Sequence, residues 1–227
     1  GTYTVDRFMA WFDGTGATGN ISQQSFVPGS APVLGYESQY YLRYNQSVAG
    51  TGGTYNNFGQ RFEDIRTFAG QTVTLSFWVN CSVTGTFGVS FRNANQDTTY
   101  CSTYTINSTN TWEYKIITVP GVTTGTWFTD NRSGIEIYWD LGVGTTYSGP
   151  AGQVNSGTNY FGVTGTTKLC STTGATFYLT GVQLEVGSSA TAFERRSYGQ
   201  ELALCQRYCL VDTNNSQPYR WFASGHT

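Results

Sequence analysis

The stretch Thr72–Val79, TVTLSFWV, alternates apolar and polar residues at every second position. Successive side chains of a β-strand point to opposite faces, so this alternation separates one apolar side from one mixed side. The apolar side would face a core and consists of Val73, Leu75, Phe77 and Val79. The other side carries Trp78. The pattern predicts a half-buried strand of an antiparallel sheet.

Three further segments have the same period: Trp112–Val119, Gly134–Leu141 and Thr176–Val186. In the last of them the apolar phase changes at Gly181, which predicts a β-bulge there. Shorter strand candidates are Thr4–Ala10, Gln39–Asn45, Phe58–Asp64 and Phe87–Phe91. About eight strands without helical segments between them predict an all-β, antiparallel β-sandwich.

Turns rich in Gly, Thr, Ser and Asn separate these strands: Asp13–Asn20, Val48–Thr54 and Val122–Thr126. One longer segment, Gly142–Phe161, has no periodicity. Long ordered loops of sandwiches tend to be functional or to contact partners, so we expect one of these roles here.

A short helix is expected after the sandwich. Ser197 and Gln200 have the spacing of a capping box, and good helix formers follow as far as Tyr208. Two short strands come next, Cys209–Asp212 and Pro218–Ala223. We therefore divide the chain into a sandwich, residues 1–194, and a helix plus strands, residues 195–227, that begin an incomplete C-terminal oligomerisation region.

The composition excludes several classes of protein. Of the 227 residues 11% are charged and 16% are aromatic, and the net charge is −2. A chain without a basic run is a poor nucleic-acid binder. No apolar stretch reaches the 18 residues that a membrane helix needs. We expect neither nucleic acid nor membrane insertion.

Metal and cofactor sites are not indicated. The five cysteines include no CxxC pair, and the one histidine is His226. Buried free thiols are the favoured interpretation, with a Cys81–Cys101 disulfide as the alternative. A structural Ca²⁺ held by loop carboxylates stays open, the candidates being Asp6, Asp13 and Asp130.

An enzyme is not expected. A hydrolytic triad needs a positioned histidine, and no GxSxG motif is present. Glu136 and Asp140 share one strand face but lie roughly 13 Å apart in a flat strand, beyond the separation of paired glycosidase carboxyls. Structural ion pairs or solvated carboxylates explain them better.

Aromatic side chains give the candidate ligand site. Trp and Tyr rings stack on sugar rings, while Asn, Gln and Asp satisfy the hydroxyl groups. Trp78 lies opposite the apolar face, and Trp127, Tyr147 and Tyr160 lie in or beside loops. The same residue types are enriched at protein–protein interfaces, so this alternative stays open.

The segment Phe177–Tyr208, FYLTGVQLEVGSSATAFERRSYGQELALCQRY, closely resembles a recurring segment of tail fibres and related receptor-binding proteins of tailed bacteriophages. The family's pattern is an aromatic strand, then TGVQLE.G..AT.FE.R, then EL..CQRY. Weaker similarity extends upstream through Phe68–Val79 and Ile135–Gly144, so the resemblance covers nearly the whole chain.

The resemblance implies a jelly-roll similar to carbohydrate-binding modules, in assemblies that are commonly homotrimeric, and no shared catalytic residue. The motif residues would form a structural junction after the last core strand: Gln183, Glu185, Phe193, Glu194, Arg195, Arg196, Cys205, Arg207 and Tyr208. We expect a virion protein of a tail fibre or spike that contacts other phage proteins and a host-surface glycan. A capsid or tail decoration protein is the alternative, and a glycan-cleaving enzyme is a remote one.

Overall fold

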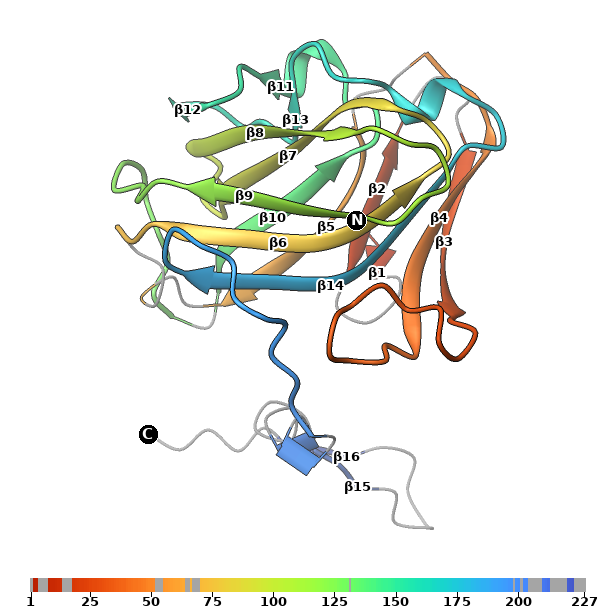
Figure 1. Ribbon diagram of the computed structural model, residues 1–227. Helices are drawn as coiled ribbons and strands as arrows, with labels where there is room; N and C mark the ends of the chain where they lie inside the picture. Colours follow the sequence, from red (N-terminus) through yellow and green to blue (C-terminus); the bar gives the residue numbers. More distant parts are fainter. Residues whose placement is uncertain are drawn as a thin grey trace. The chain divides into compact units, whose positions relative to one another are not determined.

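The computed structural model describes residues 2–3, 8–13, 18–51, 55–63, 66, 70–130, 132–197, 199–200, 202–203, 210–212 and 220–222. The chain divides into two compact units, Gly1–Phe193 and Glu194–Thr227. The first unit holds the sandwich (Figure 1).

Two antiparallel sheets form the sandwich, and they confirm the predicted all-β jelly-roll class (Figure 1). The larger sheet has the order β1 (Thr2–Tyr3), β2 (Met9–Asp13), β5 (Tyr55–Glu63), β10 (Ser133–Asp140), β7 (Gly85–Asn93), β8 (Thr98–Ile106) and β12 (Gln153–Ser156). The smaller sheet has the order β3 (Thr18–Ser25), β4 (Tyr40–Val48), β14 (Thr176–Val186), β6 (Val73–Cys81) and β9 (Glu113–Val119).

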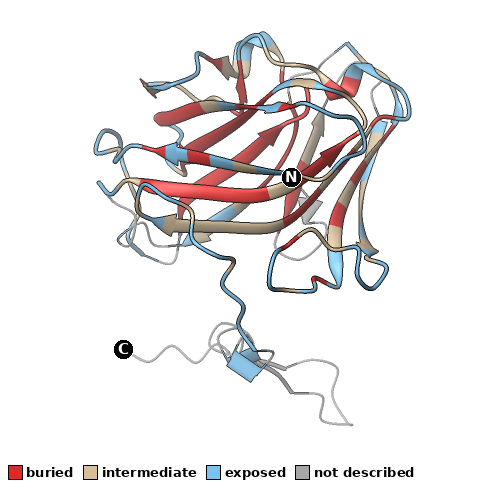
Figure 2. Ribbon diagram, viewed as in Figure 1, coloured by how far each residue is buried: buried red, intermediate tan, exposed pale blue. Residues whose placement is uncertain are grey.

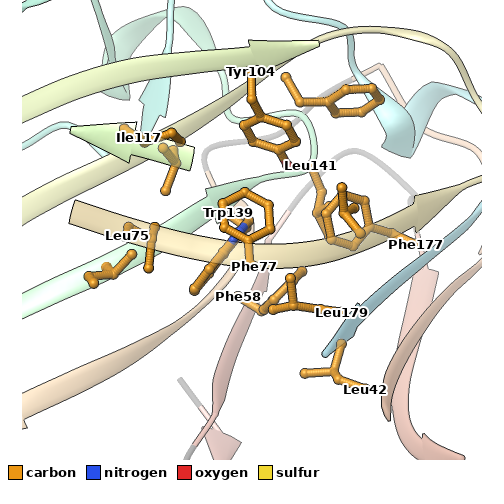
Figure 3. Close-up of a cluster of buried hydrophobic side chains, with 14 of the residues drawn as sticks. Leu42, Phe58, Leu75, Phe77, Tyr104, Ile117, Trp139, Leu141, Phe177 and Leu179 are labelled. Atoms are coloured by element: carbon orange, nitrogen blue, oxygen red, sulfur yellow. The ribbon is translucent and has the colours of Figure 1, made fainter. Parts of the chain in front are cut away.

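The core lies between the sheets and is rich in aromatic rings (Figure 3). Trp139 is fully buried and stacks on Phe58, with ring centroids 5.6 Å apart. Phe77 meets the same indole edge to face at 5.7 Å. Such aromatic pairs contribute about 0.5–1.5 kcal/mol beyond their burial. The alternation of β6 supplies Phe77 and that of β10 supplies Trp139, whereas Phe58 comes from β5, so much of this core follows from the pattern in the sequence.

The predicted bulge at Gly181 is confirmed. The register of β14 with β6 shifts between Thr180 and Gln183, and Gly181 has a φ of +57°. A Cβ at this position would lie 3.0 Å from the side chain of Val33. Glycine is therefore required both by the backbone conformation and by the available space.

The outer face of the larger sheet is covered, not solvated. The segment after β10 was expected to be a plain loop, but it contains η2 (Thr145–Tyr147), β11 (Ser148–Gly149), β12 and, just beyond, β13 (Gly162–Val163). Tyr138, Val143 and Phe161 form a second small core beneath it. Figure 2 shows the strands of this sheet mostly buried. Both faces of β10 are thus enclosed, although its sequence alternates.

The charged side chains beneath this cover have ion-pair or hydrogen-bond partners. Arg92, 1% exposed, donates through Nε to Glu136 at 3.0 Å, and its guanidinium lies 4.1 Å from the ring centre of Phe161. Arg61 makes a second ion pair with Glu136 at 2.9 Å. Asp140 accepts the backbone N–H groups of three residues, Gly142, Val143 and Val163. Burial nevertheless raises the pKa of Asp140.

Some strands were not predicted. β8 and β3 were missed because Thr, Ser and Gln hide their alternation, and β3 begins inside the expected turn Asp13–Asn20. The expected strand Thr4–Ala10 is replaced by β1 and β2, between which residues 4–7 lie outside the described part.

The three cysteines of the described residues, Cys81, Cys101 and Cys170, are buried, and Cys81 and Cys101 do not form a disulfide with each other, so the alternative Cys81–Cys101 disulfide is wrong. Cys205 and Cys209 lie outside the described residues.

The second unit contains the predicted capping box. The Ser197 backbone N–H donates to Gln200 Oε1 at 3.0 Å, and the Gln200 N–H donates to Ser197 Oγ at 3.3 Å. Gly199, Gln200, Leu202 and Ala203 are helical, and β15 (Leu210–Asp212) pairs with β16 (Arg220–Phe222). Within the described residues, no helix is long and apolar enough to cross a membrane.

Candidate functional site on the outer face of the smaller sheet

The four aromatic residues proposed from the sequence do not form one surface. Trp78 lies on the outer face of the smaller sheet, where its ring is 5.2 Å from that of Tyr114. Val33, from the loop between β3 and β4, lies against the same backbone, since both side chains approach Gly181. Trp78 is therefore half-covered by its own chain.

Trp127 closes one end of the sandwich. Its Nε1 donates to the carbonyl of Thr124 at 2.7 Å, and its ring packs against the core. A partly open pocket lies beside it, lined by Val73, Phe91, Tyr100, Val119, Val122 and Ile135 among others. Trp127 therefore packs against the core and lines this pocket, and its role in ligand binding stays a prediction.

Tyr147 and Tyr160 belong to the cover over the larger sheet. Tyr147 packs on Tyr55, with centroids 5.0 Å apart. The ring of Tyr160 lies against Gly149 so closely that a Cβ there would come within 2.2 Å of it. Both rings have structural neighbours, and they lie on the opposite sheet from Trp78.

A different group of rings gathers on the outer face of the smaller sheet. We call it the outer aromatic cluster, and it consists of Phe26, Tyr41, Trp112 and Tyr178. The Tyr41 centroid is 5.2 Å from that of Tyr178 and 5.8 Å from that of Trp112. All four side chains are partly exposed. They come from four separate parts of the chain, so their proximity depends on the sheet.

The strand register explains how the cluster forms. In β4 and β14 the buried residues Leu42 and Leu179 pair directly, and their neighbours Tyr41 and Tyr178 point to the outer face. These two tyrosines are diagonal neighbours, a geometry within reach of aromatic side chains. Trp112 immediately precedes β9, and Phe26 immediately follows β3.

Two polar side chains flank Tyr178 across the sheet. Tyr178 is paired with Arg43 of β4 on one side and with Asn80 of β6 on the other. Asn80 is 7% exposed, and its Oδ1 has no hydrogen-bond partner. The Nε of Arg43 is likewise enclosed without a partner. Both atoms are enclosed, so the surface that a ligand could reach at this place is that of the partly exposed rings.

The chemistry of this surface suits stacking with hydrogen bonding. The rings offer flat apolar area with little conformational entropy to lose, and the polar atoms beside them can donate and accept. We found no group of three or more His, Cys, Asp or Glu placed to hold a metal ion anywhere in the described residues.

The carboxylates considered for catalysis, Glu136 and Asp140, and the Ca²⁺ candidate Asp130 each have a protein partner. Glu136 accepts hydrogen bonds from Arg92 and from the hydroxyl of Tyr138, the latter at 2.7 Å. Asp140 is enclosed by backbone N–H donors. Asp130 pairs with Arg132 on an exposed loop. Asp6 and the side chain of Asp13 lie outside the described residues.

The junction motif contains a local hydrogen-bond network. Gln183 Nε2 donates to Glu185 Oε1 at 3.1 Å, and the backbone N–H of Thr191 donates to the same carboxylate at 2.8 Å. Phe193 stacks on Tyr36 with centroids 5.9 Å apart. The three residues that follow, Glu194, Arg195 and Arg196, are exposed. Arg196 Nε lies 4.0 Å from Glu194 Oε1.

The other junction residues, Cys205, Arg207 and Tyr208, lie outside the described residues. A structural role for the junction thus stays a prediction. The network does give Gln183, Glu185 and Thr191 of the motif a physical reason, because together they fix the chain where it leaves β14.

Comparison with known proteins gives similarities of fold. No protein-family profile matches the chain, and no curated protein sequence matches it. Among solved structures, it is similar to the enzymatically active domain of tailspike protein 4 of bacteriophage CBA120 (14% identity, TM-score 0.48), over 81% of this chain and 20% of that one.

It is also similar to the CBM22-1 xylan-binding domain of Paenibacillus barcinonensis Xyn10C (12% identity, TM-score 0.38), over 82% of this chain and 90% of that one. A third similar structure is described as "CBM4 structure and function" (17% identity, TM-score 0.39), with 65% of this chain and 71% of that one covered. Each TM-score is below 0.5, so what this chain binds has to be inferred from its own side chains.

Proposed function

We propose that this chain is a non-enzymatic module of a bacteriophage tail fibre or spike, and that it binds a host-surface glycan through the outer aromatic cluster. The cluster is the observation that carries the proposal, because partly exposed aromatic rings gathered on one face suit stacking on a sugar. The resemblance of Phe177–Tyr208 to tail-fibre sequences supports a place on the virion.

Assembly belongs to the same proposal. A homotrimer, attached to other tail or capsid proteins, would present three copies of the cluster. Single stacking contacts are weak, and three linked sites raise the effective affinity by orders of magnitude when the geometry allows simultaneous binding. Exposed aromatics can therefore suffice without a deep pocket.

The test is glycan binding by substituted proteins. Trp112→Ala should weaken binding about tenfold, which corresponds to about 1.4 kcal/mol, because it removes a central ring of the cluster. Tyr40→Ala is the matched control: it removes a 50% exposed tyrosine next to Tyr41 on the same strand. A glycan array followed by calorimetry measures both variants.

Equal binding by the wild-type protein and Trp112→Ala would remove the cluster from the proposal. A decoration protein is the second candidate, favoured by the exposed Tyr114 and Ile116 on the outer side of β9, which are 39% and 52% exposed. Cryo-electron microscopy of virions separates the two. Three copies per fibre support the fibre module, whereas copies spread over the capsid support decoration.

A further inference from the structure

Arg43 differs from the other arginines that the structure describes. Arg61 and Arg92 pair with Glu136, and Arg132 pairs with Asp130. Arg66, Arg195 and Arg196 also have interaction partners. None of the ion pairs within the described residues includes Arg43. Only 11% of the residues are charged, and among those that the structure describes this cation has no anion as a partner.

The position of Arg43 ties it to the outer aromatic cluster. It lies directly opposite Tyr178 across the β4–β14 pair, and it is two residues from Tyr41 on the same side of β4. Its side chain is half-buried, and its Nε is enclosed without a hydrogen-bond partner. The side chain therefore starts beside Tyr178 on the outer face, with its Nε held against the protein.

A partly desolvated guanidinium has lost water without gaining a protein acceptor. Burying such a donor unpaired is unfavourable. Only the Nε is enclosed, so an anion would meet the terminal amino groups of the same guanidinium and offset its charge there. Arginine is also the residue that holds carboxylate and sulfate-like groups with defined geometry. The net charge of the chain is −2, so the attraction for an anion is local to this site.

We infer that the outer aromatic cluster takes an acidic glycan, with a sugar ring stacked on Tyr178 and Trp112 and an anionic substituent, carboxylate or sulfate, on Arg43. This inference rests on the proposed function and specifies the class of glycan.

The experiment compares pairs of oligosaccharides that differ in one group. One pair is a uronic-acid oligosaccharide and its carboxyl-reduced form, and the other is a sulfated oligosaccharide and its desulfated form. The wild-type protein should bind the acidic member of at least one pair about tenfold more tightly, the scale of a charge-assisted hydrogen bond. The pair that shows the preference identifies the anionic group.

Arg43→Gln should abolish the preference and leave binding of the neutral member unchanged. It should also remove the salt dependence of acidic-ligand binding, since screening acts only on the charge pair. Arg132→Gln is the control, because Arg132 is an exposed arginine that pairs with Asp130 on another loop. Thermal unfolding confirms that Arg43→Gln is folded.

The outcomes separate the two proposals. If the wild-type protein binds acidic and neutral members equally, or if Arg43→Gln keeps the preference, the inference about acidic glycans is wrong. Neutral binding that Trp112→Ala still weakens would then leave the proposed function standing. Absence of binding to every glycan would overturn both.

Discussion

Arg92 illustrates how individual residues stabilise this protein. Its side chain is almost fully enclosed between the larger sheet and the segment above it, with Glu136 as its anion and the ring of Phe161 over the guanidinium. Isolated buried charges are unstable in such a place, and this one is held by its partners. The pair positions the cover of the sheet as well as the two side chains.

Replacing Arg92 alone should be strongly destabilising. Arg92→Ala leaves Glu136 buried with Arg61 as its remaining cation, so we expect a loss of about 3–5 kcal/mol in the free energy of unfolding. Urea denaturation measures it. The control is Arg132→Ala, which removes an exposed ion pair and should change the urea midpoint of unfolding little. A similar urea midpoint for both variants would contradict the role assigned to Arg92.

The buried thiols should resist alkylation. Burial raises the pKa of Cys81 to about 11 and that of Cys101 to about 12. The thiolate is the reactive form, so at pH 8 both residues should react far more slowly than a free cysteine, and the rates should rise as pH increases. Iodoacetamide labelling with peptide mass spectrometry tests this. Rapid labelling of the native protein would show that the sandwich opens locally and exposes these two cysteines, which would contradict the prediction.

At the residue scale the sequence predicted the chemistry of the site but not its members. Trp78 was correctly placed on the outer face of its strand, yet Val33 and Tyr114 lie against it. The sequence also predicts that Tyr41 and Tyr178 point outward, since each neighbours an inward-facing leucine in an alternating strand. The contact between their rings depends on the pairing of β4 with β14, which a single sequence does not specify.

Among the secondary-structure elements, β14 shows how one residue sets the register. On the N-terminal side of the bulge Phe177 and Leu179 face the core, and beyond it the phase resumes with Leu184. A strand without the extra residue would turn every later side chain to the wrong face. Gly181 therefore controls the orientation of the junction that follows.

Gly181→Ala should destabilise the sandwich. A Cβ would be strained at the positive φ and would crowd Val33, so we expect a loss of about 1–2 kcal/mol. Thermal unfolding measures the effect. Gly199→Ala, at a helical position with open space around it, is the control and should be neutral or slightly stabilising. Equal effects of the two changes would show that the bulge tolerates a side chain.

The strands that could be predicted are those with apolar alternation. β6 and β10 each place branched or aromatic residues at every second position, and both were found within two residues of their ends. β8, TTYCSTYTI, buries Tyr100 and Tyr104 among threonines and serines. Hydrogen bonding to β7 on one side and to β12 on the other makes it a strand, and neither partner is visible in its local sequence.

On the scale of the whole molecule, the two sheets are not equivalent. The larger one is covered on its outer side by the segment that contains η2, β11 and β12, whereas the smaller one carries the outer aromatic cluster. The sequence predicted two half-buried sheets. It could not predict the cover, because the residues that form it are mostly Gly, Ser, Thr and Asn without periodicity.

The sandwich should fold without the C-terminal unit. Its core consists of residues from the first unit, so a protein of residues 1–193 should unfold cooperatively at the same temperature as the full chain. Calorimetry of the two proteins tests this. A truncated protein without a cooperative transition would show that residues 194–227 contribute to the stability of the sandwich.

The outer aromatic cluster also bears on how such a protein can change over generations. Its rings stand on strands whose opposite side chains hold the core, so the two sides of the smaller sheet carry separate tasks. If the cluster binds as proposed, substitutions on the outward side would alter what is bound and leave the packing beneath almost untouched. A lineage that meets a new surface would then revise its recognition one side chain at a time, on a scaffold that does not have to be rebuilt.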